Sequence, residues 1–223
     1  MTQVLYKRVL TIGLVAGGLF TLSAGALELQ QLAPVADGSV RDGDLGSLVN
    51  PPVDGVGDRV FTNLVQVLNI DDGNNSGVDH GIVEFQITSL AGVADAELVL
   101  SRFGSKGPYP LNMSVHAYEG DGVVTLSDFG QGNLVRNFNY SGEQTVTIDV
   151  TQAVADAVAN GHDVIGFNLR VDNPSNVSLN GPFVAFATEP NGTQASLNVV
   201  VPEPASAGLL LVAGAALIRR RRG

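Results

Sequence analysis

The segment GIVEFQI, residues 81–87, decides the fold class of this chain. Its odd-numbered positions are apolar from Val83 to Ile87, while the positions between them carry a glutamate and a glutamine. Successive side chains of an extended strand point to opposite faces, so this pattern has one apolar and one polar face. TVTIDV (145–150) and IGFNLRV (165–171) repeat the alternation. We therefore predict strands with one buried and one solvent-exposed face.

Most of the chain outward from this segment has the same character. Further strands are expected at 96–103, 112–119, 181–188 and 195–201, at 36–40, and once or twice within 59–70. One helix is expected at 151–160, where Thr151 can cap the start and Gly161 can end it. A single helix cannot build a parallel α/β sheet. The predicted fold is an all-β antiparallel sandwich, a jelly roll of roughly eight to ten strands with one short helix.

Composition excludes several classes of protein. The 223 residues include no cysteine, which rules out disulfides, thiol nucleophiles and thiolate metal sites. The formal net charge is −10, and phosphates would repel such a surface, so no nucleic-acid partner is expected. Gly, Pro and small polar residues are abundant and favour tight turns between strands.

The first 26 residues have the pattern of a secretory signal peptide. Lys7 and Arg8 precede an uncharged, largely apolar run, and small residues at Ala24 and Ala26 suit signal peptidase. Cleavage is expected after Ala26, and an uncleaved anchor helix or a buried core helix is the alternative. The chain would thus comprise a signal peptide (1–26), a β domain (27–200) and a C-terminal segment (201–223).

The C-terminal segment combines three features. Pro202, Glu203 and Pro204 precede an apolar stretch at 205–218, which is followed by a cluster of four arginines. These arginines are Arg219, Arg220, Arg221 and Arg222. As a helix, the apolar stretch would be roughly 21 Å long, which is short for a bilayer, although snorkelling arginines and local thinning offset part of the shortfall.

This order of motifs resembles the PEP-CTERM sorting signal. The resemblance implies recognition by an exosortase, a membrane-embedded cysteine peptidase, with removal of the tail near the motif. It also implies export by a Gram-negative bacterium that makes extracellular polysaccharide, transient anchoring in the inner membrane, and a final place at the cell surface or in the matrix. A permanent tail anchor is the alternative. Without both ends, the body keeps six basic and 21 acidic side chains, a formal net charge of −15.

Seven segments follow one another in a fixed order along the body: ADGSV (36–40), HGIVEFQI (80–87), AELVL (96–100), HAY (116–118), IDVT (148–151), GFNL (166–169) and FVAFA (183–187). This order resembles the DNRLRE-type domain, a jelly-roll β-sandwich related to a carbohydrate-binding module. The seven segments are mostly core-pattern residues, so the resemblance supports the fold more than a particular ligand.

Catalytic chemistry is not expected. His116 should point outward with Ser114 and Tyr118, and His80 and His162 should lie at the ends of elements. No nucleophile elbow, zinc helix or phosphate loop accompanies them. The carboxylates that could pair for glycoside cleavage are expected on solvated faces; they are Glu84, Glu97, Glu119, Glu143 and Asp149.

Acidic turns could instead bind calcium. Asp71, Asp72 and Asn74 lie in the densest cluster, and further Asp-Gly turns begin at Asp37, Asp42 and Asp54. Ordinary turn geometry explains the same residues, so a structural Ca²⁺ is the weaker interpretation and no other cofactor is expected.

Aromatic platforms for sugars are scarce. Tyr109, Tyr118 and Tyr140 are the tyrosines that could be exposed, and Phe103 and Phe129 could line a groove. Tyr109, between two prolines, is the best glycan contact and could equally plug its loop. The sequence thus predicts an exported, non-enzymatic surface or matrix protein that contacts extracellular polysaccharide; the alternatives are a carbohydrate-binding module with a defined ligand and, less favoured, a polysaccharide-active enzyme.

Overall fold

The alternating segments form one antiparallel sheet that curls strongly on itself, seen in a computed structural model that describes residues 27–44, 53–62, 64–71, 76–107, 109–172, 183–188 and 194–203. The strands are β1 (Leu27–Leu32), β2 (Ala36–Asp44), β3 (Arg59–Phe61), β4 (Val65–Asp71), β5 (Ser76–Gln86), β6 (Asp95–Lys106), β7 (Leu111–Glu119), β8 (Asn133–Tyr140), β9 (Thr145–Asp149), β10 (Val164–Val171), β11 (Phe183–Phe186) and β12 (Ser196–Pro202). A 3₁₀ turn, η1 (Leu126–Asp128), and one helix, α1 (Thr151–Ala159), complete the described elements. The all-β antiparallel prediction is confirmed, with one short helix as expected.

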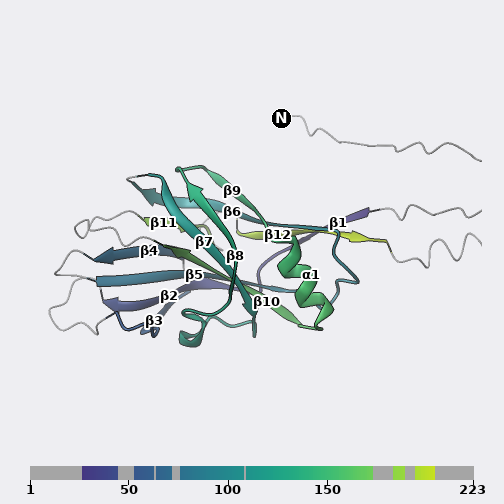
Figure 1. Ribbon diagram of the computed structural model, residues 1–223, viewed down its shortest axis with the longest axis horizontal. Helices are drawn as coiled ribbons and strands as arrows, with labels where there is room; N and C mark the ends of the chain where they lie inside the picture. Colours follow the sequence, from purple (N-terminus) through teal and green to yellow (C-terminus); the bar gives the residue numbers. More distant parts are fainter. Residues whose placement is uncertain are drawn as a thin grey trace, which may run out of the picture. The chain divides into compact units, whose positions relative to one another are not determined.

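The two long strands β5 and β6 organise the sheet, because each pairs with three others (Figure 1). β5 pairs with β2 along one edge, while β4 and β10 pair successively with the other. β6 pairs with β12 through its first half, with β11 through its second half, and with β9. Because the neighbours change along both strands, the sheet bends, and its apolar sides enclose one core.

The core contains the apolar side chains that the alternation of each strand predicts to be buried. Phe85 and Phe167 are fully buried and meet edge to face, with ring centroids 6.2 Å apart. Leu98 and Leu100 of β6 and Ile148 of β9 belong to the same cluster. Burying side chains of this size contributes roughly 1.5–3 kcal/mol each, so this cluster stabilises the curl.

The prediction of a solvent-exposed opposite face is wrong for β5 and β10. Glu84 and Asn168, on the polar faces of these strands, are both 0% exposed. The segments around Gly57 and Phe129 cover this face: a Cβ on Gly57 would lie 2.6 Å from Val40 and 3.0 Å from Phe129. The outer face of the β2–β5–β10–β7 sheet is thus a second, polar interior.

Helix α1 begins and ends almost where predicted, although its cap differs. Gly161 adopts a positive φ of 73° just beyond the helix, which is the backbone conformation that favours glycine at a helix end. Thr151 is not the N-cap; it is the first helical residue, and its hydroxyl donates to Asp95 and accepts from the Ala96 N–H. Asp149 accepts the Thr151 N–H instead.

Two strands were not predicted from the sequence. β1 and β8 lack a clear alternation of buried and exposed positions, since most of their side chains are exposed. Neighbouring strands impose their extended form: β1 pairs with β12, and β8 pairs with β7. Because of these additions, the described strands number twelve rather than eight to ten.

The predicted ends lie mostly outside this description. Ala24, Ala26, Pro204 and the four terminal arginines are not among the described residues. Pro202 ends β12, opposite Leu27, and Glu203 is exposed just beyond it. Within the described part of the chain, no helix has the length and hydropathy to cross a membrane.

Candidate functional site

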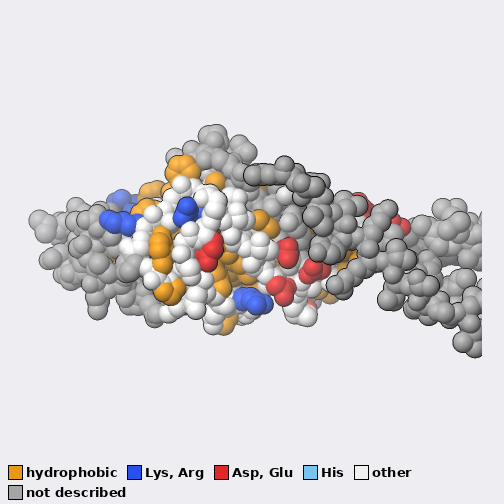
Figure 2. Space-filling view, turned by 90° about the horizontal axis from the view of Figure 1, so that it is seen from above, with side chains coloured by type: hydrophobic (Ala, Val, Ile, Leu, Met, Phe, Trp, Pro, Cys, Tyr) orange, Lys and Arg blue, Asp and Glu red, His pale blue; other side chains and the backbone are white. Residues whose placement is uncertain are grey.

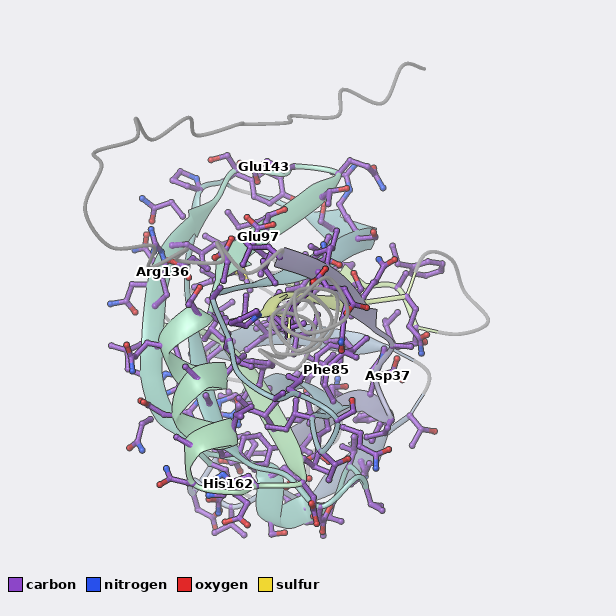
Figure 3. The ribbon with its side chains drawn as sticks, turned by 90° about the vertical axis from the view of Figure 1, so that its right-hand side faces the viewer. Asp37, Phe85, Glu97, Arg136, Glu143 and His162 are labelled. Atoms are coloured by element: carbon purple, nitrogen blue, oxygen red, sulfur yellow. The ribbon has the colours of Figure 1, made fainter. Side chains whose placement is uncertain are left out.

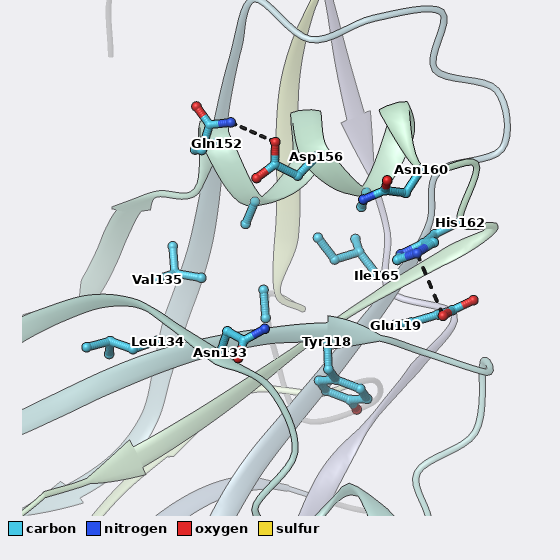
Figure 4. Close-up of a pocket in the computed structure, with 13 residues that line it drawn as sticks. Tyr118, Glu119, Asn133, Leu134, Val135, Gln152, Asp156, Asn160, His162 and Ile165 are labelled. Atoms are coloured by element: carbon cyan, nitrogen blue, oxygen red, sulfur yellow. Dashed lines mark hydrogen bonds and ion pairs between the residues drawn. The ribbon is translucent and has the colours of Figure 1, made fainter.

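A cleft of about 370 Å³ lies against helix α1 and strands β7 and β8 (Figure 4). The cleft results from the way the strands of the sheet are paired. Among the described ladders, β8 pairs with β7 alone and β9 with β6 alone, so the curled sheet stays open between β8 and β9. The side chains of Arg136 and Asp149 approach to 3.8 Å across this opening, but both are more than half exposed, so the pair contributes little.

The cleft has an apolar and a polar set of lining side chains. The apolar set is Ala117, Leu134, Val135, Ala153, Ala157 and Ile165, together with the ring of Tyr118. The polar set is Glu119, Asn133, Gln152, Asp156, Asn160 and His162, most of which are exposed. Alanines on the inner face of α1 leave the space open, since a larger side chain at Ala153 or Ala157 would enter it.

The charges of the cleft are carboxylates. Glu119 lies 3.7 Å from His162, and Asp156 accepts a hydrogen bond of 2.7 Å from Gln152 (Figure 4). No lysine or arginine is among these lining residues. Figure 2 shows acidic side chains gathered toward the same end of the molecule as α1. The cleft is therefore suited to a neutral or cationic polar ligand rather than an anionic one.

Tyr118 connects the cleft to the polar interior. Its hydroxyl donates a 2.7 Å hydrogen bond to Glu84 Oε1, and the Gly122 N–H donates a 2.7 Å bond to Glu84 Oε2. Burial raises the pKa of the Glu84 carboxyl, while these two donors act in the opposite direction. Burial and the neighbouring Glu84 likewise raise the pKa of the Tyr118 phenol. The pair thus joins β5, β7 and the loop after β7.

Two glycines make room for this pair. A Cβ on Gly166 would lie 2.3 Å from the Tyr118 ring, and a Cβ on Gly120 would lie 2.8 Å from Glu84 Oε1. Such distances exclude any side chain unless the ring or the carboxylate moves. The glycine at position 166 of β10 is therefore required by its contact with Tyr118 of β7, the neighbouring strand in the sheet.

His80 is a buried stacking residue, which corrects the prediction that it ends an element at the surface. It lies inside β5 and is 7% exposed. Its ring stacks on Phe129 with centroids 4.1 Å apart, and its Nδ1 accepts the Gly130 N–H at 3.3 Å. Burial, with the nearby positive charges of Arg170 and His116, lowers the pKa of His80 to about 3. The imidazole is therefore neutral at physiological pH.

The loop between β7 and β8 (residues 120–132), which we call the covering loop, is held by hydrogen bonds from the sheet. Asn168 Nδ2 donates to the Asp128 carbonyl at 2.7 Å, and Arg170 donates to the Gln131 carbonyl. Within the loop, the Asp128 carboxylate accepts the Thr125 N–H at 2.6 Å. Burial raises the pKa of Asp128. These polar groups bind one another and hold the loop in place.

One polar cluster has the residue types of a catalytic triad but the wrong order of hydrogen bonds. It consists of Ser114, His116 and Asp172. The Ser114 hydroxyl donates to Asp172 at 2.7 Å, and His116 Nε2 lies 3.2 Å from the same hydroxyl. A catalytic triad needs histidine between serine and carboxylate. Ser114 is moreover only 1% exposed, so the prediction that it points to solvent is wrong, and the group links β7 to the end of β10.

The candidate carboxylates separate into one buried and four exposed side chains. Glu84 is buried, contrary to expectation, whereas Glu97, Glu119, Glu143 and Asp149 are exposed as predicted. Figure 3 shows Glu143 at the outside of the molecule and Phe85 nearer the interior. The structure therefore does not pair Glu84 with another of these carboxylates in a solvent-accessible groove.

Asp37 and Asp42 do not begin turns as predicted, because both lie in strand β2. Two described carboxylates of the acidic segments accept backbone N–H groups from residues distant in the sequence. Asp42 accepts the N–H groups of Asp54 and Gly55, and Asp58 accepts that of Gly43. The calcium candidates Asp72 and Asn74 lie outside the described residues, and for Asp71 only the backbone is described. Among described side chains, no three His, Asp or Glu residues gather as a metal site would require.

The predicted aromatic contacts are only partly available at the surface. Tyr109 is 37% exposed and meets Tyr140 edge to face, with centroids 5.6 Å apart. Tyr140 is fully buried, contrary to expectation, and Phe103 is 56% exposed. Tyr109 thus packs against the end of β8 and is partly exposed to solvent, and its contact with a glycan stays a prediction.

Sequence reasoning missed the cleft itself. Its walls come from four elements that are separated along the chain, and most of its residues carry no motif. The available signal was the pair of alanines, Ala153 and Ala157, one turn apart on α1.

No family model and no curated protein matches the chain. Among solved structures, it is similar to the enzymatically active domain of tailspike protein 4 from bacteriophage CBA120, with 11% identity and a TM-score of 0.28. The match covers 78% of this chain and 19% of the tailspike chain. The chain thus corresponds to about a fifth of that protein, and a likeness of this degree carries no argument about function.

Proposed function

We propose that this chain is an exported, non-catalytic protein of the bacterial cell surface or extracellular matrix, with a structural or adhesive role among exopolysaccharides. The observation that carries the proposal is the pair of terminal signals. A basic and apolar leader ends in small residues at Ala24 and Ala26, and Pro202-Glu203-Pro204 precedes an apolar stretch and four arginines. An exosortase would recognise the second signal.

The polar interior supports a non-catalytic role. Several of the buried polar groups, among them Glu84, Ser114, His80 and Asn168, hydrogen-bond residues of other strands, of a strand end or of the covering loop between β7 and β8. Groups used in this way hold a fold together. A curled antiparallel sheet with an interior on both sides of β5 also supports the finer fold we propose, a jelly-roll sandwich of the DNRLRE type.

Processing at both ends is directly testable. Expression of the full chain in a host with an exosortase should yield a protein that begins at Leu27 and lacks the arginine cluster, as measured by mass spectrometry of the outer fractions. A host without the exosortase should retain the tail in its inner membrane. Recovery of the intact chain as a soluble cytosolic protein would overturn the proposal.

The cleft favours a second candidate function, a carbohydrate-binding module with a defined ligand. Amide and carboxylate groups surround an apolar lining that includes the Tyr118 ring, and saccharides present both hydroxyls and apolar faces. The absence of lysine and arginine from this lining favours neutral or amino sugars over uronates. A panel of neutral, amine-bearing and anionic polysaccharides, presented to the processed protein, separates the two candidates: saturable binding to one glycan favours the module, and uniform weak binding favours the structural role.

A further inference from the structure

Strand β1 is the most exposed edge of the described sheet. Among the described residues it pairs only with β12, so its other edge carries backbone N–H and C=O groups that no described strand uses. Leu27 and Leu29 are 65% and 67% exposed, the highest values among the large apolar side chains described. Both faces and one edge of β1 are therefore accessible over most of its length.

The two faces of the β1–β12 ribbon differ in their surroundings. On one face, Leu32 packs against the core together with buried residues of β12. On the other face, Leu29 lies opposite Val200 and Leu27 lies opposite Pro202. That second face is an apolar strip on the outside of the molecule, and its two leucines keep most of their surface exposed to water.

Natural sheets protect exposed edges with lysine, proline, bulges or very short strands. Two other free edges among the described strands have such protection: β8 carries Arg136 at its centre and has a register shift opposite β7, and β3 is three residues long and begins with Arg59. A third, β9, pairs only with β6 among the described strands; it is five residues long, and its Asp149 lies 3.8 Å from Arg136 of β8. β1 is six residues long, with the sequence LELQQL, and contains none of these features. Its single charged side chain is Glu28.

We propose that β1 pairs antiparallel with β1 of a second copy of this chain, about a twofold axis that passes between the two copies of Leu29. Because this axis is perpendicular to the sheet, each side chain stays on its own face of the sheet. Odd-numbered residues therefore face odd-numbered residues, and even-numbered residues face even-numbered ones. In this register Leu29 faces Leu29 of the second copy, Glu28 faces Gln30, and Leu27 faces Gln31. No two carboxylates oppose each other, and glutamine can donate to glutamate, so the edge is complementary to itself.

This pairing goes beyond the proposed function and uses none of the cleft. It joins two β1–β12 ribbons into four continuous strands and brings the two apolar strips together at Leu29. An edge of five or six residues is small for an interface, so the association should be weak and concentration-dependent. It would link neighbouring copies wherever the protein is concentrated on a surface.

The absence of cysteine makes the pairing measurable by disulfide trapping. The full chain, purified in detergent, is prepared as three single variants: Leu29→Cys, Leu27→Cys and Leu134→Cys. All three sites are well exposed, with Leu27 and Leu29 nearly equal. Directly opposed residues of antiparallel strands lie about 4.5–5.5 Å apart, within disulfide range, whereas thiols introduced at residue 27 would be offset by four positions.

Mild oxidation should convert Leu29→Cys to a covalent dimer at least about fivefold faster than either control, as seen on non-reducing gels. Adding Glu28→Lys and Gln30→Lys to Leu29→Cys places lysines opposite one another and should abolish the difference. Equal rates for all three single variants, or faster trapping through residue 27, would overturn the proposal. Membrane-tail association alone would give equal rates, so the controls separate it from edge pairing.

Discussion

The hydroxyl of Tyr118 donates a 2.7 Å hydrogen bond to the buried carboxylate of Glu84, and the same tyrosine ring lines the cleft beside α1. One side chain thus belongs to both the surface site and the polar interior. A change that disturbs the interior at this point should therefore also change the cleft.

Tyr118→Phe should lower the free energy of unfolding by about 1–3 kcal/mol, because Glu84 loses one of its two described donors while it stays buried. Tyr109→Phe, at the partly exposed ring, is the matched control and should change stability by less than about 0.5 kcal/mol. Urea unfolding followed by circular dichroism measures both. Equal losses of unfolding free energy in the two variants would mean that the hydrogen bond from Tyr118 to Glu84 stabilises the protein no more than the Tyr109 hydroxyl does.

Gly166→Ala should destabilise the protein by about 1–3 kcal/mol, because the new methyl group would meet the Tyr118 ring at 2.3 Å. Gly104→Ala, in β6, is the control, since a Cβ there meets nothing within 4 Å. Thermal unfolding of the two variants should differ by several degrees. If the two variants have the same melting temperature, the Tyr118 ring can move aside without loss of stability, contrary to the close packing described.

His80 should make stability depend on pH in the acid range. Its pKa is about 3 in the folded protein against 6.5 for a free histidine, so the unfolded chain binds the extra proton between these values. The free energy of unfolding should fall by about 1 kcal/mol per pH unit below pH 6.5, relative to His80→Phe. Parallel profiles for wild type and His80→Phe would contradict the burial of a neutral imidazole.

Glu84 should act in the opposite direction. Because its pKa is raised above the usual 4.5, the folded protein binds the proton more tightly than the unfolded chain. The contribution of Glu84 is therefore greatest below pH 4.5 and is lost as the pH rises through the raised value. Wild type should lose stability relative to Glu84→Gln over this range, as measured by urea unfolding at successive pH values. A wild-type advantage that grows with pH would show that the two hydrogen bonds outweigh burial.

Filling the cleft should remove saccharide binding and leave the fold intact. Ala153→Leu projects a larger side chain into the cleft, and leucine suits a helix nearly as well as alanine. Binding should fall at least about tenfold, while the melting temperature changes little. Ala159→Leu, on the exposed end of the same helix and outside the lining, is the matched control. Unchanged binding by Ala153→Leu would place saccharide contact elsewhere, with Tyr109 as the next site to substitute.

The strands were predictable wherever alternation coincides with a one-sided core. Val83, Phe85 and Phe167 are buried as their spacing indicates, and the helix ends where Gly161 follows it. β8 was not predictable, because most of its side chains face solvent and its extended form comes from pairing with β7. The cleft was not predictable either, since its lining combines α1 with three strands.

The sequence by itself determined that the body is an antiparallel β domain with one helix, because period-two alternation is a local property of each segment. Only the tertiary structure decided that Glu84, His80 and Asn168 are buried and that β1 pairs with a single neighbour among the described strands. The reason is that alternation records which face of a strand is apolar, and not what lies above the other face. Whether a polar side chain meets water or the Tyr118 hydroxyl depends on segments far away in the chain, and these meet only when the sheet curls.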